Sequence, residues 1–97
     1  MNKPKIGTAM KKPIPCRFIQ WTGENLLDVI RFTGQNASAM DYKWEDYEDL
    51  VAKKGLKIFS LEGNEVIDIG AYIMEGIKGE NWSIKEDIFA ATYDVIN

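Results

Sequence analysis

The sequence of 97 residues contains no histidine and a single cysteine, Cys16. Without histidine, the usual general base, the Ser-His and Cys-His nucleophile pairs and the commonest metal ligand are all excluded. One cysteine can form neither an intramolecular disulfide nor a thiolate cluster for zinc. Carboxylate pairs occur in any acidic chain, and none here has a spacing that indicates a site. The composition therefore predicts a protein that is not an enzyme and needs no cofactor or metal.

Long apolar runs are absent too, since no stretch approaches the roughly 20 apolar residues that a membrane-spanning helix needs. Residues 1–12 carry four lysines and no apolar run that could form the core of a signal peptide. We therefore expect a cytoplasmic protein that does not enter a membrane. The length suits one domain, which predicts a flexible basic arm at 1–12 and a single domain at 13–97. Met10 is an alternative start to Met1, because the patterned sequence begins just after it.

Positive charge is scarce outside the arm. The chain has 12 basic and 15 acidic side chains, and four of its lysines lie within the first dozen residues, so the rest carries 8 basic against 15 acidic groups. Affinity for nucleic acid comes largely from neutralisation of phosphates, so a nucleic-acid polymer is not expected as a partner. A small anionic ligand is still compatible with this balance, because a pocket needs only two or three well-placed cations.

The first half of the chain shows one strand and two helix patterns. Residues 14–21 alternate as a strand does, and Pro15 places the start of that strand at a sheet edge. The next segment predicts a short helix that Thr22 caps and Gly34 ends in a left-handed turn. The buried stripe of this helix is expected to contain Leu26, Leu27, Val29 and Ile30.

A second helix is expected at 42–54, capped by Asp41 and ended by Gly55, after a linker at 35–40. Its apolar positions recur at helical spacing and are expected to face a sheet: Trp44, Tyr47, Leu50 and Val51. The spacing of its acids does not match that of a calcium-binding loop and favours a solvated helix face. These acids are Glu45, Asp46, Glu48 and Asp49.

After Gly55 the pattern changes to that of strands. We expect a hairpin with a turn at 62–64, a strand at 71–76, a turn at 77–80 and a short strand at 81–83. Ser83 and Glu86 would then form a capping box for a final helical turn. The predicted fold is α+β, with a small antiparallel sheet of about five strands, two helices inserted after the first strand and a short C-terminal helical turn.

Two features could serve either a ligand or the fold. Gly76 and Gly79 flank Lys78, and backbone amides beside a lysine can hold a phosphate, although a hairpin turn is the simpler explanation of such glycines. Trp82 lies near Lys78 and Lys85 in the sequence, so its ring could stack on a base or belong to the core. Cys16 alternates with buried positions and is most simply a small core residue.

Two segments resemble a group of short phage and prophage proteins, namely KKPIPCRFIQWTGENLLDVIRFTG near the start and IDIGAYIMEGIKGENWSIKEDIFAATY near the end. Those proteins open with a lysine-proline strand followed by Gln, an aromatic residue, Thr and Gly. They close with a Gly-x-Tyr-Ile strand, a Gly-centred turn and an Asp-Ile-Phe tail. This chain has Ile69 and Ala71 where they usually have proline and aspartate, and Glu75 where they often have arginine.

Within that group, the resemblance is to the anti-CBASS sponges, small oligomeric proteins that sequester cyclic oligonucleotide immune signals and so keep host effectors inactive. It implies a phage immune-evasion protein that binds a cyclic dinucleotide such as 3'3'-cGAMP in the host cytoplasm without hydrolysing it. It also implies a homo-oligomer, a dimer at least and by expectation a tetramer, with sites shared between protomers. The candidate ligand-binding residues, rings for the bases and cations for the phosphates, are Arg17, Tyr72, Lys78, Trp82 and Lys85.

A second function from a different class stays open. The acidic helix at 41–54 could be the contact face of a protein-protein adaptor that inhibits a host enzyme or serves phage assembly, because an acidic surface attracts basic partners. The residues alone do not identify the ligand, nor do they separate the aromatic rings of the core from those that face a ligand.

Overall fold

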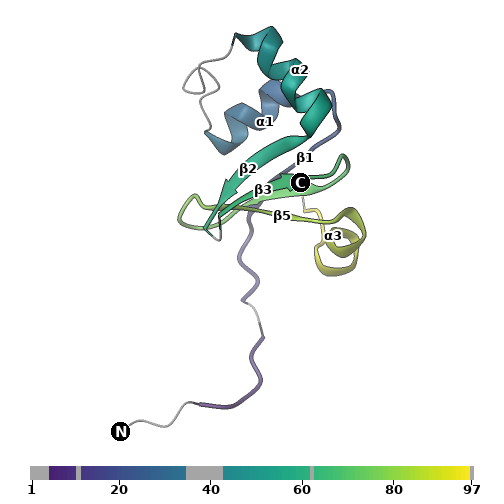
Figure 1. Cartoon of the computed structure of the whole chain (residues 1–97). Helices are drawn as coiled ribbons and strands as arrows, with labels where there is room; N and C mark the ends of the chain where they lie inside the picture. The colour runs from purple at the N-terminus through teal and green to yellow at the C-terminus, as the bar shows by residue number, and fades with distance from the viewer. Residues whose placement is uncertain (1–4, 11, 35–42, 62, 97) are drawn as a thin grey trace, which may run out of the picture.

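The computed structural model describes residues 5–10, 12–34, 43–61 and 63–96. Its elements follow in the order β1 (Arg17–Gln20), α1 (Leu26–Thr33), α2 (Trp44–Lys54), β2 (Leu56–Ser60), β3 (Gly63–Ile67), β4 (Tyr72–Glu75), β5 (Asn81–Ile84) and α3 (Glu86–Thr92). The α+β class, the antiparallel strands and the two helices after the first strand agree with the prediction. In Figure 1, α1 and α2 lie together on one side of the strands and α3 lies on the other.

The strands form two antiparallel sheets. β4 is the central strand of a three-stranded sheet, with β1 and β5 at its edges, while β2 and β3 form a separate hairpin. In that hairpin Ser60 pairs with Gly63, so Gly63 and Asn64 belong to β3 and not to the expected turn at 62–64. The expected strand at 14–21 is shorter, because only 17–20 pair with β4. Pro13 and Pro15 have no N–H to donate to a ladder, which suits the irregular segment before β1.

One face of the three-stranded sheet carries the main core. Ile19 and Ile73 pair directly and point to this face, and Ile73 is completely buried. The buried residues that form a cluster with Ile73 come from the loops beside the sheet, from both long helices and from the hairpin: Trp21, Leu26, Val29, Ile30, Tyr47, Val51, Leu56, Ile58, Ile67 and Ala71. The hydroxyl of Ser83 in β5 donates a hydrogen bond of 2.7 Å to Glu65 Oε1 in β3, which joins the two sheets.

α1 begins later than predicted, and Thr22 does not cap it. The N-cap residue is Asn25, whose side chain makes no capping bond to the helix. Its Oδ1 instead accepts from the Thr22 N–H and hydroxyl, and its Nδ2 donates to the Gln20 carbonyl, so Asn25 ties the loop to β1. Leu27 is 46% exposed, because the stripe that faces the core contains only Leu26, Val29 and Ile30. Gly34 ends the helix with a left-handed φ of 70°, as predicted.

α2 ends at Lys54 before Gly55, as predicted, while its expected start at 42, the cap Asp41 and the linker at 35–40 lie outside the described residues. Tyr47 and Val51 are buried and Trp44 packs against the core cluster, whereas Leu50 is half-buried. The four acids of this helix are all exposed, as expected for a solvated face.

The capping box predicted from Ser83 and Glu86 is wrong. β5 continues to Ile84, which pairs with Tyr72, so Ser83 lies inside a strand and its hydroxyl is engaged with Glu65. α3 begins at Glu86 after the N-cap residue Lys85, whose side chain makes no capping bond. None of the helices in the described part of the chain combines the length and the hydrophobicity that a bilayer crossing requires.

A groove beside the first strand as candidate functional site

The second face of the three-stranded sheet carries aromatic rings. Phe18 and Tyr72 alternate with the core residues of β1 and β4 and therefore point to this face. α3 covers it through Phe89, whose ring stacks on that of Tyr72 with the centroids 3.8 Å apart and tilts against Phe18 at 5.0 Å. Tyr93 extends the column, 5.5 Å from Phe89 at an interplanar angle of 11°. This column of rings holds α3 and the segment after it against the sheet.

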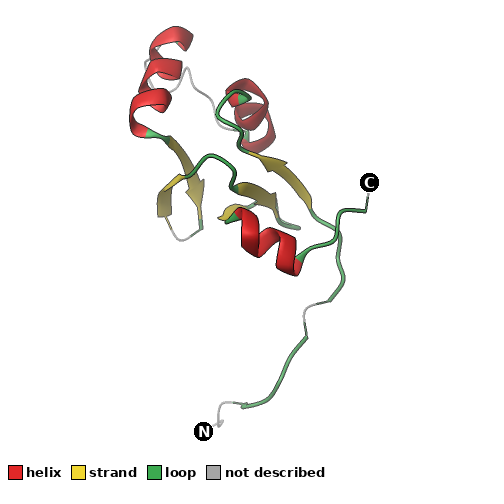
Figure 2. Cartoon of the chain, turned by 90° about the vertical axis from the view of Figure 1, so that its right-hand side faces the viewer, coloured by secondary structure: helices red, strands yellow, loops and turns green. Residues whose placement is uncertain are grey.

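A groove of about 1110 Å³ runs along β1 at the edge of the sheet, and its lining includes residues from both faces. Residues 12–18 form one wall, and the end of α3 with residues 92–96 forms the other. Figure 2 shows the segment before β1 and the C-terminal segment lying near one another. The groove is slightly larger than the roughly 300–1,000 Å³ of a typical ligand pocket. Four aromatic rings line it: Phe18, Phe32, Phe89 and Tyr93.

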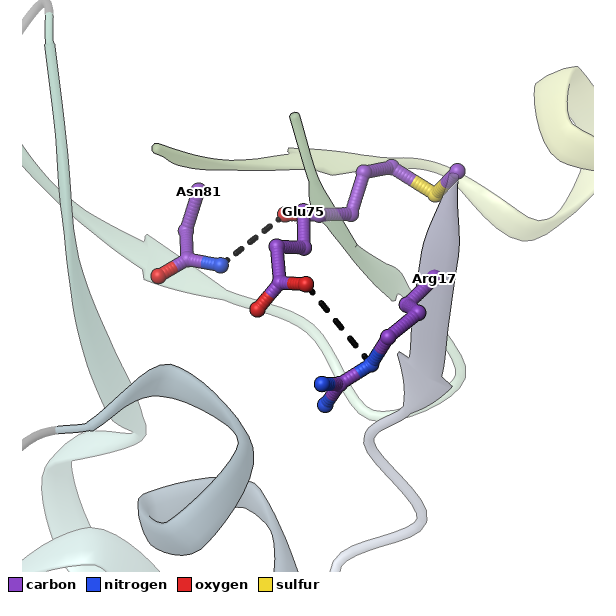
Figure 3. Close-up of polar contacts among 4 residues, drawn as sticks. Arg17, Glu75 and Asn81 are labelled. Atoms are coloured by element: carbon purple, nitrogen blue, oxygen red, sulfur yellow. Dashed lines mark hydrogen bonds and ion pairs between the residues drawn. The ribbon is translucent and has the colours of Figure 1, made fainter. Parts of the chain in front are cut away.

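The lining of the groove includes charged residues of both signs. Lys12 and Arg17 bring positive charge to the first wall, and Asp94 brings a carboxylate to the second. The Arg17 guanidinium lies 4.8 Å from the centroid of the Phe32 ring, and its Nε lies 3.6 Å from Glu75 Oε1 (Figure 3). Because the Arg17 side chain is 67% exposed, this ion pair stabilises the fold by at most about 1 kcal/mol. Arg17 alternates with Phe18 and therefore points to the first face of the sheet, on the side of Glu75 and Phe32, and it lines the groove from there.

The backbone of β1 adds polar groups to the same wall. Trp21 N–H donates to the Ala71 carbonyl, which continues the pairing of β1 with β4. In an antiparallel pair, successive residues direct their backbone groups alternately toward the partner and away from it. The N–H and C=O of Phe18 therefore point away from β4, at the open edge of the sheet, where a ligand in the groove can meet them.

The five predicted ligand residues do not form one site within a single chain. Arg17 lines the groove, whereas Tyr72 does not line it and contacts it only indirectly, through its stack on Phe89. Trp82 pairs with Met74 and lies in β5, so the central strand β4 separates it from β1. Lys78 and Lys85 lie at opposite ends of β5, in the turn before it and directly after it.

The glycines around Lys78 are explained by a turn that satisfies its own amides. Gly76 N–H donates to the Glu80 carbonyl and Gly79 N–H to the Gly76 carbonyl. Lys78 N–H donates to Glu80 Oε2 at 3.1 Å, so a carboxylate already occupies the position that a phosphate would take on this amide. The same carboxylate lies where a Cβ of residue 76 would be, so a larger residue there would displace the Glu80 side chain from this turn.

Other polar groups near the sheet have structural roles. The buried Asn81 donates from Nδ2 to the Met74 carbonyl at 3.1 Å and so fixes the start of β5 against β4 (Figure 3). Cys16 is half-buried and lines the groove instead of the core. Within the described ranges, no group of three or more His, Cys, Asp or Glu side chains could hold a metal ion.

The sequence reasoning missed Phe32, Phe89 and Tyr93, which come from α1 and from the C-terminal part of the chain. The spacing of Phe89 and Tyr93, four residues apart in a helical segment, was a signal that the two rings would share one face. Nothing in the spacing indicated that this face would meet Phe18.

The chain matches no known family model, no curated protein and no solved structure. The resemblance to anti-CBASS sponges therefore stays a prediction, and the function is argued from the groove.

Proposed function

We propose that the protein binds and sequesters a cyclic dinucleotide such as 3'3'-cGAMP without hydrolysing it, and so blocks the activation of CBASS effectors in the host cytoplasm. The observation that carries this proposal is the groove beside β1, because it combines aromatic rings with two cations. A cyclic dinucleotide has matching parts, since its flat bases stack on rings and its phosphates pair with Lys or Arg.

The groove is organised before any ligand enters. Phe89 is held between Tyr72 and Tyr93, and the Arg17 guanidinium is held over Phe32. Side chains that are already ordered lose little conformational entropy on binding, so more of the interaction energy remains as affinity. A sponge requires tight binding without turnover, and the chain has no histidine to serve as a general base for hydrolysis.

Trp82 and Lys85, which were also predicted to contact the ligand, can do so only in an oligomer. β5 is the far edge of the sheet from β1, so Trp82 and Lys85 would contact a ligand in the groove from a neighbouring protomer. A groove that is open along one side, as here, is completed when a second copy covers it. We therefore propose a homo-oligomer, a tetramer, in which each groove receives residues from a partner copy.

The test is calorimetric titration of the purified protein with 3'3'-cGAMP, followed by recovery of the ligand after denaturation. We expect 3'3'-cGAMP to bind and to be recovered chemically unaltered. Arg17→Ala should weaken it by about 10- to 100-fold, the effect of losing a charge-assisted hydrogen bond. Arg31→Ala is the matched control, because Arg31 is exposed on α1 away from the groove lining and should leave the affinity unchanged. No binding, or recovery of a hydrolysed ligand, would contradict the proposal.

The exposure of the α2 acids favours a second candidate, an adaptor that contacts a basic host protein. α2 and α3 lie on opposite sides of the strands (Figure 1), and no residue of α2 lines the groove, so the acids can be replaced without altering it. In a pulldown from host lysate, an adaptor would retain a stoichiometric protein that Glu48→Lys and added salt both release. Arg17→Ala should have no effect on that capture.

A further inference from the structure

The Arg17 guanidinium is held by two neighbours, and neither of them occupies its hydrogen-bond donors. Its Nε lies 3.6 Å from Glu75 Oε1, which is close enough for an ion pair and too far for a hydrogen bond. Its central carbon lies 4.8 Å from the centroid of the Phe32 ring. Within the described part of the chain, these are the contacts of the guanidinium. The charge is therefore oriented, while its N–H groups keep their capacity to bind an acceptor.

The sheet places Glu75 where it can hold Arg17 without meeting a ligand. The two residues are direct partners in the ladder between β1 and β4, so their side chains leave the same face of the sheet (Figure 3). The Glu75 side chain is 26% exposed against 67% for Arg17, so the carboxylate is the more restricted partner. Arg17 and Phe32 line the groove, whereas Glu75 does not. Any effect of Glu75 on a ligand in the groove should therefore act through Arg17.

The contact through Nε determines which part of the guanidinium meets a ligand. Because Glu75 approaches Nε and the Phe32 ring lies against the group, the two terminal amino groups are the donors left for an acceptor. Two parallel N–H groups match the two non-bridging oxygens of a phosphodiester, in a bidentate and charge-assisted pair. A lysine ammonium would act only as a point charge in the same place.

We infer that Glu75 and Phe32 are positioning residues that hold Arg17 for bidentate recognition of a phosphodiester, an inference that rests on the proposed function. A long arginine side chain loses much rotamer freedom when it is fixed, and a side chain that is already held loses less of it on binding. The Glu75 carboxylate itself repels an anionic ligand. It can therefore favour binding only by orienting the guanidinium, which makes its effect depend on Arg17.

The experiment is a double-mutant cycle on the full chain, with the affinity for 3'3'-cGAMP measured by calorimetry. Glu75→Gln keeps the shape of the side chain and removes its charge. It should weaken binding by about three- to fivefold, because an exposed ion pair is a weak restraint. The same change in an Arg17→Ala background should cause no further weakening. Glu24→Gln also removes one negative charge, at an exposed acid outside the groove lining, and should bind as wild type does.

Two further measurements test the geometry. Arg17→Lys keeps the positive charge and loses the fork of N–H groups, so it should weaken binding by about tenfold or more. Nitrogen-15 relaxation of Arg17 Nε in the ligand-free protein should report an ordered side chain. Glu75→Gln and Phe32→Leu should each make that group more mobile.

The outcomes separate this inference from the proposed function. Equal weakening by Glu75→Gln with and without Arg17 would show that the carboxylate supports only the fold, and tighter binding would show that it opposes the ligand. Either result would overturn the inference and leave the proposed function standing, as would wild-type affinity in Arg17→Lys or a mobile Arg17 in wild type. If wild type does not bind 3'3'-cGAMP, the proposed function and the inference both fail.

Discussion

The two faces of the three-stranded sheet are covered to different extents, and this difference separates stability from binding. On the first face, Ile19 and Ile73 pack into a hydrophobic cluster that two helices and a hairpin complete. On the second face, Phe18 and Tyr72 meet one short helix, and the groove remains beside the rings. The apolar surface buried on a closed face stabilises the fold, whereas a partly covered face leaves oriented rings that a ligand can contact.

The largest effect on stability is expected from the closed face. Ile73 is 0% exposed, so Ile73→Ala removes buried methyl groups and leaves a cavity that costs about 2–5 kcal/mol of unfolding free energy. Val66→Ala is the control, because Val66 is 58% exposed on the hairpin and should cost at most about 0.5 kcal/mol. Urea denaturation measures both. Similar losses in the two variants would contradict the assignment of the core to this face.

On the aromatic face, Phe89→Leu should lower both stability and affinity. The variant keeps an apolar side chain and loses the stack on Tyr72, a contact of about 0.5–1.5 kcal/mol beyond burial. We also expect weaker binding of 3'3'-cGAMP by about tenfold, because the ring that lines the groove is gone. Phe59→Leu, at a ring 47% exposed on the hairpin, should leave binding intact. An unchanged affinity in Phe89→Leu would show that the column of rings is not the ligand platform.

The open side of the groove predicts self-association that does not depend on the arm. Light scattering of the full chain and of a form that starts at Met10 should give the same tetramer mass without ligand. The shorter form retains Lys12 and the rest of the groove wall. A monomer at micromolar concentration would exclude sites shared between protomers. Assembly lost only in the shorter form would show that the basic arm contributes to the interface.

The smallest effect concerns a single buried phenol on the closed side. Burial raises the pKa of Tyr47 above its ordinary value of 10.0. The unfolded chain then ionises at a lower pH than the folded protein, so stability falls as the pH rises past about 10. Melting temperatures between about pH 8 and pH 11 should show this fall in wild type and in Tyr93→Phe, and a smaller one in Tyr47→Phe. An identical fall in all three proteins would mean that other groups cause it.

Local signals predicted the elements of this fold well. Gly34 and Gly55 end their helices where the periodicity stops, and the strands lie where the alternation indicates them. These features depend on neighbouring residues only. The capping box failed because β4 holds Ser83 in β5, and no local pattern reveals a partner strand.

The site was harder to predict, because its residues come together only through long-range pairing. Phe18 reaches Phe89 only because β1 pairs with β4 and α3 folds over that face. The glycines around Lys78 gave only a weak local signal for a phosphate, and a turn was the simpler explanation of them. Glu80, a residue with no special pattern, supplies the acceptor in that turn.

The most direct test of the account is a map of backbone amide shifts on addition of 3'3'-cGAMP, by NMR of the isotope-labelled protein. We predict that the perturbed amides gather at Arg17, Phe18, Phe89, Tyr93 and Asp94, the two walls of the groove. The hairpin face at Lys57 and Val66 and the acidic α2 should not shift. Perturbations centred on α2, or none at saturating ligand, would contradict the claim that the groove along β1 is the binding site.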